Sequence, residues 1–242
     1  MRSAAIVAIC ALMLSGCVSA SPEATAANDP FEPANRAVYK FDQRFDKYVL
    51  LPVAGFYFYY MPRPMRRGLH NVLTNLELPA TFANDVLQGE FSRAGTTLGR
   101  FTLNSTIGLG GFVDVATTIG LYYHHTDFGE TLGRYGIPEG PFLVLPIIGP
   151  DPPRDLLGDA VDIALNPLFY VPPAAPLYEH ALSAGAANGG ATFETRIPHI
   201  VLRRELERGS VDSYATMRST YRQVRAGDVD WGLPPMDESG DK

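Results

Sequence analysis

The apolar residues of this chain recur at helical rather than alternating spacing. Val38, Phe41, Phe45 and Tyr48 fall at steps of three and four residues, which predicts an amphipathic helix over about 33–49. Stripes of the same kind indicate further helices within 65–76, 79–88, 90–105, 154–164 and 214–224. The fold class that this pattern predicts is all-α, assembled from short amphipathic helices.

The 20 prolines are spread along the chain and are expected to limit most helices to about two or three turns. Pro52 fits the first position of a short helix that ends near Met61. Pro79 is expected to stop the helix that carries Met65, so that a separate helix follows over 79–88. Strand spacing is rare, and the best example, 142–145, lies within a long ordered loop over 137–153.

Two stretches stand out by their apolar character. Residues 56–60 are consecutive aromatics, and a helix with aromatic side chains on every side must be buried in protein or lie at a membrane interface. The glycine-rich segment, residues 105–123, is nearly as long as a membrane span but is interrupted by glycines. Irregular backbone cannot face lipid unless its polar groups are satisfied. We therefore expect a hairpin packed against protein, and a buried turn in a soluble core is the alternative.

The N-terminus has the features of a bacterial lipoprotein signal. Arg2 precedes an apolar run over 4–14, and Leu14-Ser15-Gly16-Cys17 fits the lipobox, in which small residues allow cleavage before an acylated cysteine. We expect residues 1–16 to be removed, Cys17 to carry the lipid, and residues 17–28 to form a flexible tether. Val18 rather than aspartate follows the cysteine, which favours the outer membrane over the inner one.

Processing also bounds the chemistry of the mature chain. It keeps one cysteine, so it cannot form an internal disulfide. The formal net charge of −6 becomes −7 when Arg2 is lost, and this sign argues against a nucleic-acid partner. Two or more acyl chains on Cys17 make detachment from the bilayer negligible, because each buried methylene contributes about 0.8 kcal/mol.

No constellation in the sequence indicates catalysis, a cofactor or a metal. The chain has no Gly-x-Ser-x-Gly elbow, and its one mature cysteine is expected to be acylated. His124 and His125 are adjacent, with Asp127 close by, but adjacent side chains diverge and do not form the i,i+4 pair of a helical metal site. The sequence therefore predicts a protein that is not an enzyme.

Two polar clusters fit structural roles. Asp127 and Glu130 have the spacing of a capping box, which predicts a helix from about 128 to 135. Asp155 and Asp159 fall on one face of the helix over 154–164, with Arg154 nearby, and this spacing predicts a local salt bridge.

A series of short motifs runs along the chain over about 29–225. They are Asp29-Pro30-Phe31-Glu32, Asn35-Arg36, Asp46-Lys47-Tyr48-Val49-Leu50, Asn71-Val72-Leu73-Thr74-Asn75-Leu76 with Pro79, Leu87-Gln88-Gly89, Arg100-Phe101-Thr102-Leu103-Asn104-Ser105-Thr106, Gly110-Gly111-Phe112-Val113-Asp114-Val115-Ala116, Phe128-Gly129-Glu130-Thr131-Leu132-Gly133-Arg134-Tyr135-Gly136, Gly140-Pro141-Phe142-Leu143-Val144-Leu145-Pro146, Arg154-Asp155 with Gly158-Asp159, and finally Asp212, Tyr214 and Arg218 to Arg225. In this order the motifs resemble the MlaA (VacJ) family of outer-membrane lipoproteins. The match thins between 168 and 200, where helix placement stays open.

The resemblance implies a ring-like helical bundle with an amphipathic central channel, held in the inner leaflet of the outer membrane of a Gram-negative bacterium beside a trimeric porin. Mislocalised phospholipid would leave the outer leaflet through this channel and pass to a periplasmic carrier of the same pathway. Exposing a lipid with about 30 methylenes to water would cost on the order of 24 kcal/mol. Such a path must therefore shelter the acyl tails.

The resemblance also assigns the glycine-rich segment to the wall or gate of the channel, where glycines permit close backbone packing or hinge motion. The candidate residues of this site are Asn71, Asn75, Asn104, Gly108, Gly110, Gly111, Phe112 and Asp114. Helix caps and turns are the alternative role of the polar members. A scaffolding envelope lipoprotein without lipid transfer is the alternative function. The family domain is expected over 29–231, followed by a disordered tail over 232–242.

Overall fold

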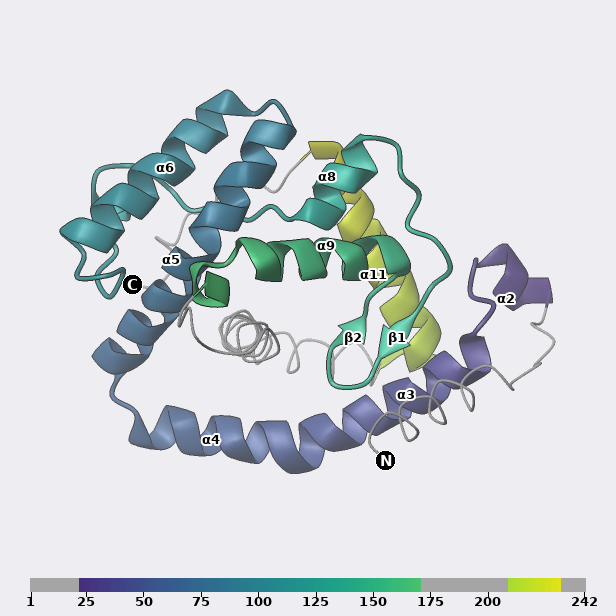
Figure 1. Cartoon of the computed structure of the whole chain (residues 1–242). Helices are drawn as coiled ribbons and strands as arrows, with labels where there is room; N and C mark the ends of the chain where they lie inside the picture. Colours follow the sequence, from purple (N-terminus) through teal and green to yellow (C-terminus); the bar gives the residue numbers. More distant parts are fainter. Residues whose placement is uncertain (1–21, 171–208, 232–242) are drawn as a thin grey trace, which may run out of the picture.

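The computed structural model describes residues 22–170 and 209–231 (Figure 1). The prediction of an all-α fold is confirmed, because β1 and β2 form only a short antiparallel pair with Val144 opposite Pro150. The predicted signal peptide, Cys17, the 232–242 tail and most of 168–200 lie outside the described residues. The elements are α2 (Pro22–Ala26), α3 (Glu32–Phe45), the π-helix η1 (Asp46–Leu50), α4 (Leu51–Tyr60), α5 (Arg63–Leu87), α6 (Phe91–Thr106), α7 (Val115–Thr118), α8 (Phe128–Arg134), β1 (Val144–Leu145), β2 (Gly149–Pro150), α9 (Pro153–Leu165), the 3-10 helix η2 (Pro167–Tyr170) and α11 (Ser213–Trp231).

The first two predicted helices join into one continuous helical run. α3 leads through η1 into α4 without a break, and the N–H of Leu51 donates to the carbonyl of Asp46, five residues back. Pro52 lies in the first turn of α4 and has no backbone N–H to donate, so a wider turn just before it accommodates the proline. Both predicted helices are therefore present, but no loop separates them.

The prediction that Pro79 ends a helix is wrong. α5 continues through Pro79, and buried residues lie on both sides of the proline. An interior proline costs about 3 kcal/mol, but polar contacts hold the second half of α5 in place. Asn84 Nδ2 donates to Asp162 at 2.9 Å, and His124 Nε2 lies 2.9 Å from each carboxylate oxygen of Asp85. Tertiary contacts thus outweigh the local tendency of proline to stop a helix.

The described elements follow one another around a closed circuit. α3 and α4 form one side, and α5 turns away after α4, packs along α6 and reaches α8 and α9 (Figure 1). α9 lies across from α4, α11 packs on α8, and β1 returns to α3. This arrangement agrees with the predicted ring-like bundle, whereas an open channel through the ring stays a prediction.

One small cluster supplies the apolar core. It consists of Tyr39, Phe142, Val144 and Tyr214. The predicted apolar face of α11 contributes to it, because Met217 and Tyr221 pack against the cluster beside Tyr214. Val224, predicted on the same face, is exposed instead. The contacts of the C-terminal helix with this apolar cluster therefore come from its first three turns.

Most of the described interior is polar. Buried polar and charged residues outnumber the buried hydrophobic ones, and many large hydrophobic side chains are exposed. Globular interiors usually show the opposite preference. The described part of the chain therefore directs much of its apolar surface outward. Among its helices, none combines the length and the hydropathy that crossing a bilayer requires.

Part of the predicted flexible tether is folded. α2 begins at Pro22, and Ala24 within it is buried. The carbonyl of Asn28 accepts a hydrogen bond from the N–H of Phe142 at 2.9 Å, and its side chain donates to the carbonyl of Gly140 at 2.7 Å. The prediction is wrong for residues 22–28, because a small, polar composition gives no sign of such long-range bonds.

Candidate functional site

The glycine-rich segment reverses tightly against the end of α6. Residues 107–113 form consecutive turns, α7 follows, and the chain then runs without regular structure to α8. Ile107, Leu109 and Ile119 are exposed, the second of them at 75 %. The expected hairpin packed against protein therefore describes this segment better than the alternative of a buried turn.

Asp114 anchors the reversal to α6. Its carboxylate accepts hydrogen bonds from Arg100 Nη2 at 2.8 Å, from Asn104 Nδ2 at 2.9 Å and from Thr117 Oγ1 at 2.5 Å. Arg100 also donates to Thr117 and to the carbonyl of Leu121. Burial favours the neutral acid, but the bonds from Thr117, Asn104 and Arg100 outweigh it, so the pKa of Asp114 is lowered. The predicted residues Asn104 and Asp114 therefore form a charged structural anchor.

Asn71 and Asn75 fasten the same segment from α5. Asn75 Nδ2 donates to Ser105 Oγ at 2.9 Å, and Asn71 Nδ2 donates to the carbonyl of Phe112 at 3.2 Å. A cavity of about 10 Å³ lies between α5 and α6, roughly the space for one water. It is lined by Asn75 and Arg100, and Asn75 Oδ1 and Arg100 Nε are buried there without a partner among the described residues.

Two glycines of the segment are required by close packing. A Cβ on Gly111, whose φ is +92°, would lie 2.6 Å from the Cβ of Asn75. A Cβ on Gly108 would lie 2.2 Å from the carbonyl oxygen of Val113. Gly110 has φ +71° but open space around it. All the predicted site residues other than Cys17 thus meet where α5, α6 and the glycine-rich segment join.

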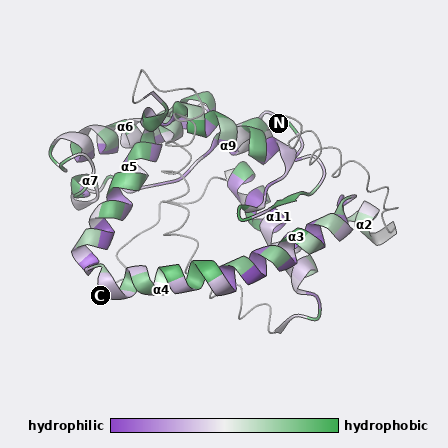
Figure 2. Ribbon diagram, turned by 60° about the horizontal axis from the view of Figure 1, so that its bottom comes forward, coloured by the Kyte–Doolittle hydropathy of each residue, from purple (hydrophilic) through white to green (hydrophobic). Residues whose placement is uncertain are grey.

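The run of aromatic residues lies on α4 and faces outward. Phe56, Tyr59 and Tyr60 are exposed at 66 %, 82 % and 65 %, and Figure 2 shows α4 as a mostly hydrophobic ribbon. Of the two alternatives for this run, burial in protein therefore does not apply. The Arg66 guanidinium lies 4.6 Å from the centre of the Phe58 ring, which places a cation beside this apolar face.

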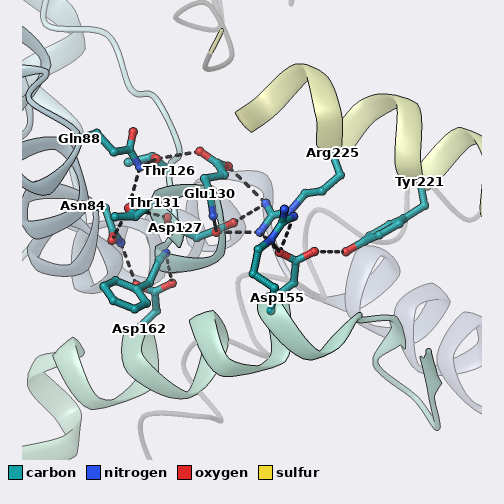
Figure 3. Close-up of polar contacts among 12 residues, drawn as sticks. Asn84, Gln88, Thr126, Asp127, Glu130, Thr131, Asp155, Asp162, Tyr221 and Arg225 are labelled. Atoms are coloured by element: carbon teal, nitrogen blue, oxygen red, sulfur yellow. Dashed lines mark hydrogen bonds and ion pairs between the residues drawn. The ribbon is translucent and has the colours of Figure 1, made fainter. Parts of the chain in front are cut away.

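A second polar centre joins α8, α9 and α11. Arg225 of α11 donates to both oxygens of Asp127, at 2.7 and 2.8 Å, and to Asp155 at 3.0 Å (Figure 3). Glu130 lies 3.4 Å from the same guanidinium, and Tyr221 donates to Asp155 at 2.8 Å. Burial favours the neutral acids, but the bonds from Arg225 outweigh it and lower the pKa of both Asp127 and Asp155.

Two other carboxyl groups of this centre have raised pKa values. Burial, helped by the charge of Asp127, raises the pKa of Glu130 to about 7. Burial also raises the pKa of Asp162 to about 6, although Asp162 accepts hydrogen bonds from Asn84 and from the N–H of Phe128. The described residues of this centre include more carboxyl groups than arginines, which favours protonation of the acids whose pKa is raised.

Two sequence predictions about this centre hold in part. Asp127 caps α8, because its Oδ1 accepts from the N–H of Glu130 at 2.7 Å, as predicted. The predicted salt bridge forms between Arg154 and Asp155 at 2.9 Å and does not include Asp159. His124 and His125 diverge as expected, since His124 contacts Asp85.

His125, Asp127 and Glu130 come together with ligand atoms within 4.8 Å of one another, a geometry that can hold a metal ion. The guanidinium of Arg225 already contacts both of these carboxylates. An arginine in this position competes with any cation for the same oxygens. The arrangement fits an arginine network better than a metal ion. It does not test the expectation that the chain has no metal site.

The sequence placed Arg225 in the last family motif but did not reveal its role, because its partners lie up to 98 residues away along the chain. One signal was present in the sequence. Arg218, Arg222 and Arg225 recur at steps of four and three on α11, beside the apolar stripe of that helix. Arg218 donates to Asp29 at 2.6 Å, so the stripe binds carboxylates along the helix. The pattern indicated a charged face but not which acids it meets.

These observations define the class of protein first. It is an all-α domain with arginine–carboxylate networks inside and aromatic, apolar helices outside, behind an N-terminus with a lipobox. The family model described as MlaA lipoprotein matches residues 27–228. The chain therefore belongs to the MlaA lipoprotein family, and the resemblance that its motifs suggested is confirmed.

Its relatives share most of this length. The chain is 34% identical over 218 residues to the intermembrane phospholipid transport system lipoprotein MlaA of Haemophilus influenzae, covering 88% of this chain and 84% of the relative. It is 40% identical over 154 residues to the protein of the same description from Escherichia coli, covering 62% and 61%. A solved structure reported as "Structural basis for maintenance of bacterial outer membrane lipid asymmetry" matches with a TM-score of 0.69 and 32% identity, over 81% of this chain and 96% of that one.

Proposed function

We propose that this chain is an outer-membrane lipoprotein that moves phospholipids between membranes and so maintains lipid asymmetry. Its family includes named components of an intermembrane phospholipid transport system, and their match extends over most of the folded domain. The single observation in this chain that carries the proposal is the placement of its residues. Charged networks fill the interior, and apolar side chains line the exterior.

This placement suits a protein immersed in lipid. The exposed aromatic face of α4 and the exposed tips of the glycine-rich segment would meet acyl chains, and tyrosines are favoured at the membrane interface. Polar groups that line a path between these surfaces would bind the lipid head group. The contacts that hold Asn104 and Asp114 suit the wall of such a path, since a charged wall beside lipid must have all its groups satisfied.

The finer steps of the proposal follow the family. Cys17, acylated after cleavage of residues 1–16, anchors the chain to the inner leaflet of the outer membrane, where the protein lies beside a trimeric porin. Phospholipid misplaced in the outer leaflet passes through the ring and is handed to a periplasmic carrier. The protein performs no covalent chemistry. A scaffolding lipoprotein is the alternative, because exposed apolar helices also suit protein partners.

The test begins with a strain that lacks the chain. Loss of transport is expected to raise the amount of phospholipid at the cell surface and to sensitise the strain to detergent. Wild-type protein restores both readouts, whereas Cys17→Ser does not. Cys10→Ser is the matched control, because Cys10 leaves with the signal peptide and its replacement is expected to restore both. Normal lipid asymmetry in the deletion strain would favour the scaffold.

Photocrosslinking locates the path. A photoreactive residue at Leu109 or Ile119 is expected to yield phospholipid adducts in living cells, because both side chains are exposed on the glycine-rich segment. The same probe at Asp230, exposed on α11, serves as the control. Adducts with protein alone at Leu109 and Ile119 would contradict the assignment of this segment to the channel wall, even if the deletion strain loses asymmetry.

A further inference from the structure

A cavity of about 230 Å³ opens beside the Arg225 centre, between β2, α9 and α11. This is far more than the space that one water needs. Asp151 precedes α9, Asp159 lies on it, and Asp228 is on α11, and all three line the cavity. In the part of the chain that the structure describes, none of these three carboxyl groups pairs with an arginine or a lysine.

Asp151 is the most telling of the three. The residue is 4 % exposed, and its Oδ2 is buried without a hydrogen-bond donor among the described residues. Burying a carboxylate without a partner is costly. Burial and the charges of Asp159 and Asp155 raise the pKa of Asp151 to about 7, and burial with the charge of Asp127 raises the pKa of Asp159 to about 6. Among the described residues, the acids of this site therefore outnumber the cations when they are ionised.

The neighbouring arginine supplies only part of the missing positive charge, since its charge lowers the pKa of Asp151 and Asp159 without outweighing the effects that raise it. Arg225 also lines the cavity, but its two terminal nitrogens are bonded to Asp127 and Asp155. Its position leaves Asp151 and Asp159 facing the same space, and neither is paired directly with an arginine or a lysine among the described residues. A cation that enters this cavity would complete the pairing that Arg225 begins.

The shape of the cavity decides which cation fits. Asp151, Asp159 and Asp228 surround a space instead of converging on one point, and the group of described residues with ligand atoms within 4.8 Å lies elsewhere, at His125. A compact metal ion needs oxygens close together. The same cavity is lined by Ile148 and Val224, whose apolar side chains are exposed at 59 % and 55 %. A cavity lined by acidic residues and bordered by exposed apolar side chains suits an amphiphile with a cationic head group.

We propose that this cavity binds the primary ammonium group of an aminophospholipid head group, such as that of phosphatidylethanolamine, with Asp151 and Asp159 as its partners. Asp228 completes the acidic wall, and the acyl chains leave over Ile148 and Val224. The proposal rests on the proposed function, to which it adds the class of head group. An ammonium ion donates three hydrogen bonds in a compact geometry, which matches carboxylates placed on different walls.

The test measures binding to the purified mature protein in detergent. The probes are short-chain phosphatidylethanolamine, the phosphatidylglycerol with the same chains, and free ethanolamine. The ethanolamine lipid is expected to bind about tenfold more tightly than the glycerol lipid, a difference of about 1.4 kcal/mol. The double variant Asp151→Asn with Asp159→Asn removes this preference. Asp230→Asn, an exposed acid on the same helix as Asp228, is expected to keep it.

Each remaining outcome has a clear meaning. Equal binding of the two lipids by the wild type, or a preference that survives in the double variant, overturns the proposal. Tight binding of free ethanolamine without any gain from the acyl chains would make this a site for small amines and also overturns it. Displacement of the ethanolamine lipid by millimolar Ca²⁺, with direct Ca²⁺ binding that the double variant loses, would identify a metal site instead.

The failure of this inference is distinguishable from failure of the proposed function. If both lipids bind equally and the deletion strain loses lipid asymmetry, the proposed transport function is supported and the proposed head-group selection is contradicted. If neither lipid binds and lipid asymmetry is normal in that strain, the proposed transport function is contradicted. Thermal unfolding of the double variant checks that it folds, and the single variant Asp228→Asn is expected to weaken the preference without abolishing it.

Discussion

Arg100 and Arg225 sit at the centres of two buried networks with opposite charge balance. Arg100 meets one carboxylate, that of Asp114, which also receives bonds from Asn104 and Thr117. Arg225 meets Asp127 and Asp155, while further carboxyl groups around it have no arginine or lysine partner among the described residues. In the first network one arginine balances one carboxylate, whereas in the second the described carboxyl groups outnumber the arginines. The difference indicates that the charges of the first network balance one another, while the second also leaves room for a ligand.

Arg225→Ala tests this comparison and is expected to have the largest effect on stability. Removing the guanidinium leaves the carboxylate of Asp127 buried without its cation and leaves Asp155 with Arg154 alone, which is expected to destabilise the protein by about 3–5 kcal/mol. Chemical unfolding of the mature protein in detergent measures the change. Arg134→Ala on α8 is the control. It breaks a partly exposed pair with Glu90 and is expected to cost about 1 kcal/mol or less. Equal effects would show that the Arg225 centre is no more important than a surface pair.

Gly111→Ala tests the other network through its packing. The backbone of Gly111 has φ +92°, and a Cβ there would lie 2.6 Å from the Cβ of Asn75. We expect a loss of about 2–4 kcal/mol, from the left-handed conformation and the forced shift of Asn75. Gly110→Ala is the matched variant next to it, because φ is +71° but no atom lies within 4 Å. It should lose only about 1–2 kcal/mol. A loss for Gly110→Ala as large as that for Gly111→Ala would remove close packing as the reason.

Asp151→Asn is expected to stabilise the protein, and only at higher pH. Because the folded state raises the pKa of Asp151 from 3.8 to about 7, the ionised acid destabilises the fold increasingly between pH 4 and pH 7. The penalty is absent below about pH 4 and complete above about pH 7. Asparagine removes it, with a gain of about 1–2 kcal/mol at pH 8, below the ceiling of roughly 4 kcal/mol that the pKa shift sets. The groups that face Asp151 are Asp127, Asp155, Asp159, Tyr221, Arg225 and Asp228.

Unfolding at pH 8 and at pH 4.5 measures this gain. Asp230→Asn, on the exposed side of α11, is expected to leave stability unchanged at both values. A gain of the same size at both pH values would mean that the removed charge is not responsible. A loss at pH 8 would mean that Asp151 has a partner in the folded protein and that the cavity is not short of positive charge.

The comparison also shows what spacing along the chain can and cannot reveal. α6 and α8 begin and end close to where apolar spacing and the Asp127 cap predicted. The error at Pro79 arose because local preference was weighed without the buried contacts of Asn84 and Asp85. Helical propensity acts within a few residues, whereas those contacts join α5 to partners far along the chain. Local rules therefore found the elements but not the contacts that override them.

The residues of the Arg100 network could be predicted from the sequence better than those of the Arg225 network. Asn104 and Asp114 lie ten residues apart, and both fell within motifs or next to the glycine-rich segment, so they could be chosen from the sequence. Asp127 and Arg225 lie 98 residues apart and join only when α11 packs on α8. Asp155 was assigned a local partner that it does have, but its bond to Arg225 could not be foreseen. Charge spacing reveals a polar face, while its partner depends on the tertiary fold.

Asn71→Ala is expected to have the smallest effect on stability, and it tests whether Asn71 has a structural or a lipid-binding role. Asn71 makes one exposed hydrogen bond, to the carbonyl of Phe112 at 3.2 Å, so Asn71→Ala is expected to cost about 0.5 kcal/mol or less. Asn104→Ala is the contrast, because buried Asn104 donates to Asp114 at 2.9 Å and accepts from the N–H of Ala116 at 3.0 Å. It should cost about 2–3 kcal/mol. If Asn71 contacts lipid in the channel, its variant lowers lipid transfer in cells while unfolding stays unchanged. Unchanged transfer would leave Asn71 as a surface bond that fastens the glycine-rich segment, and the path for lipid would have to run elsewhere in the ring.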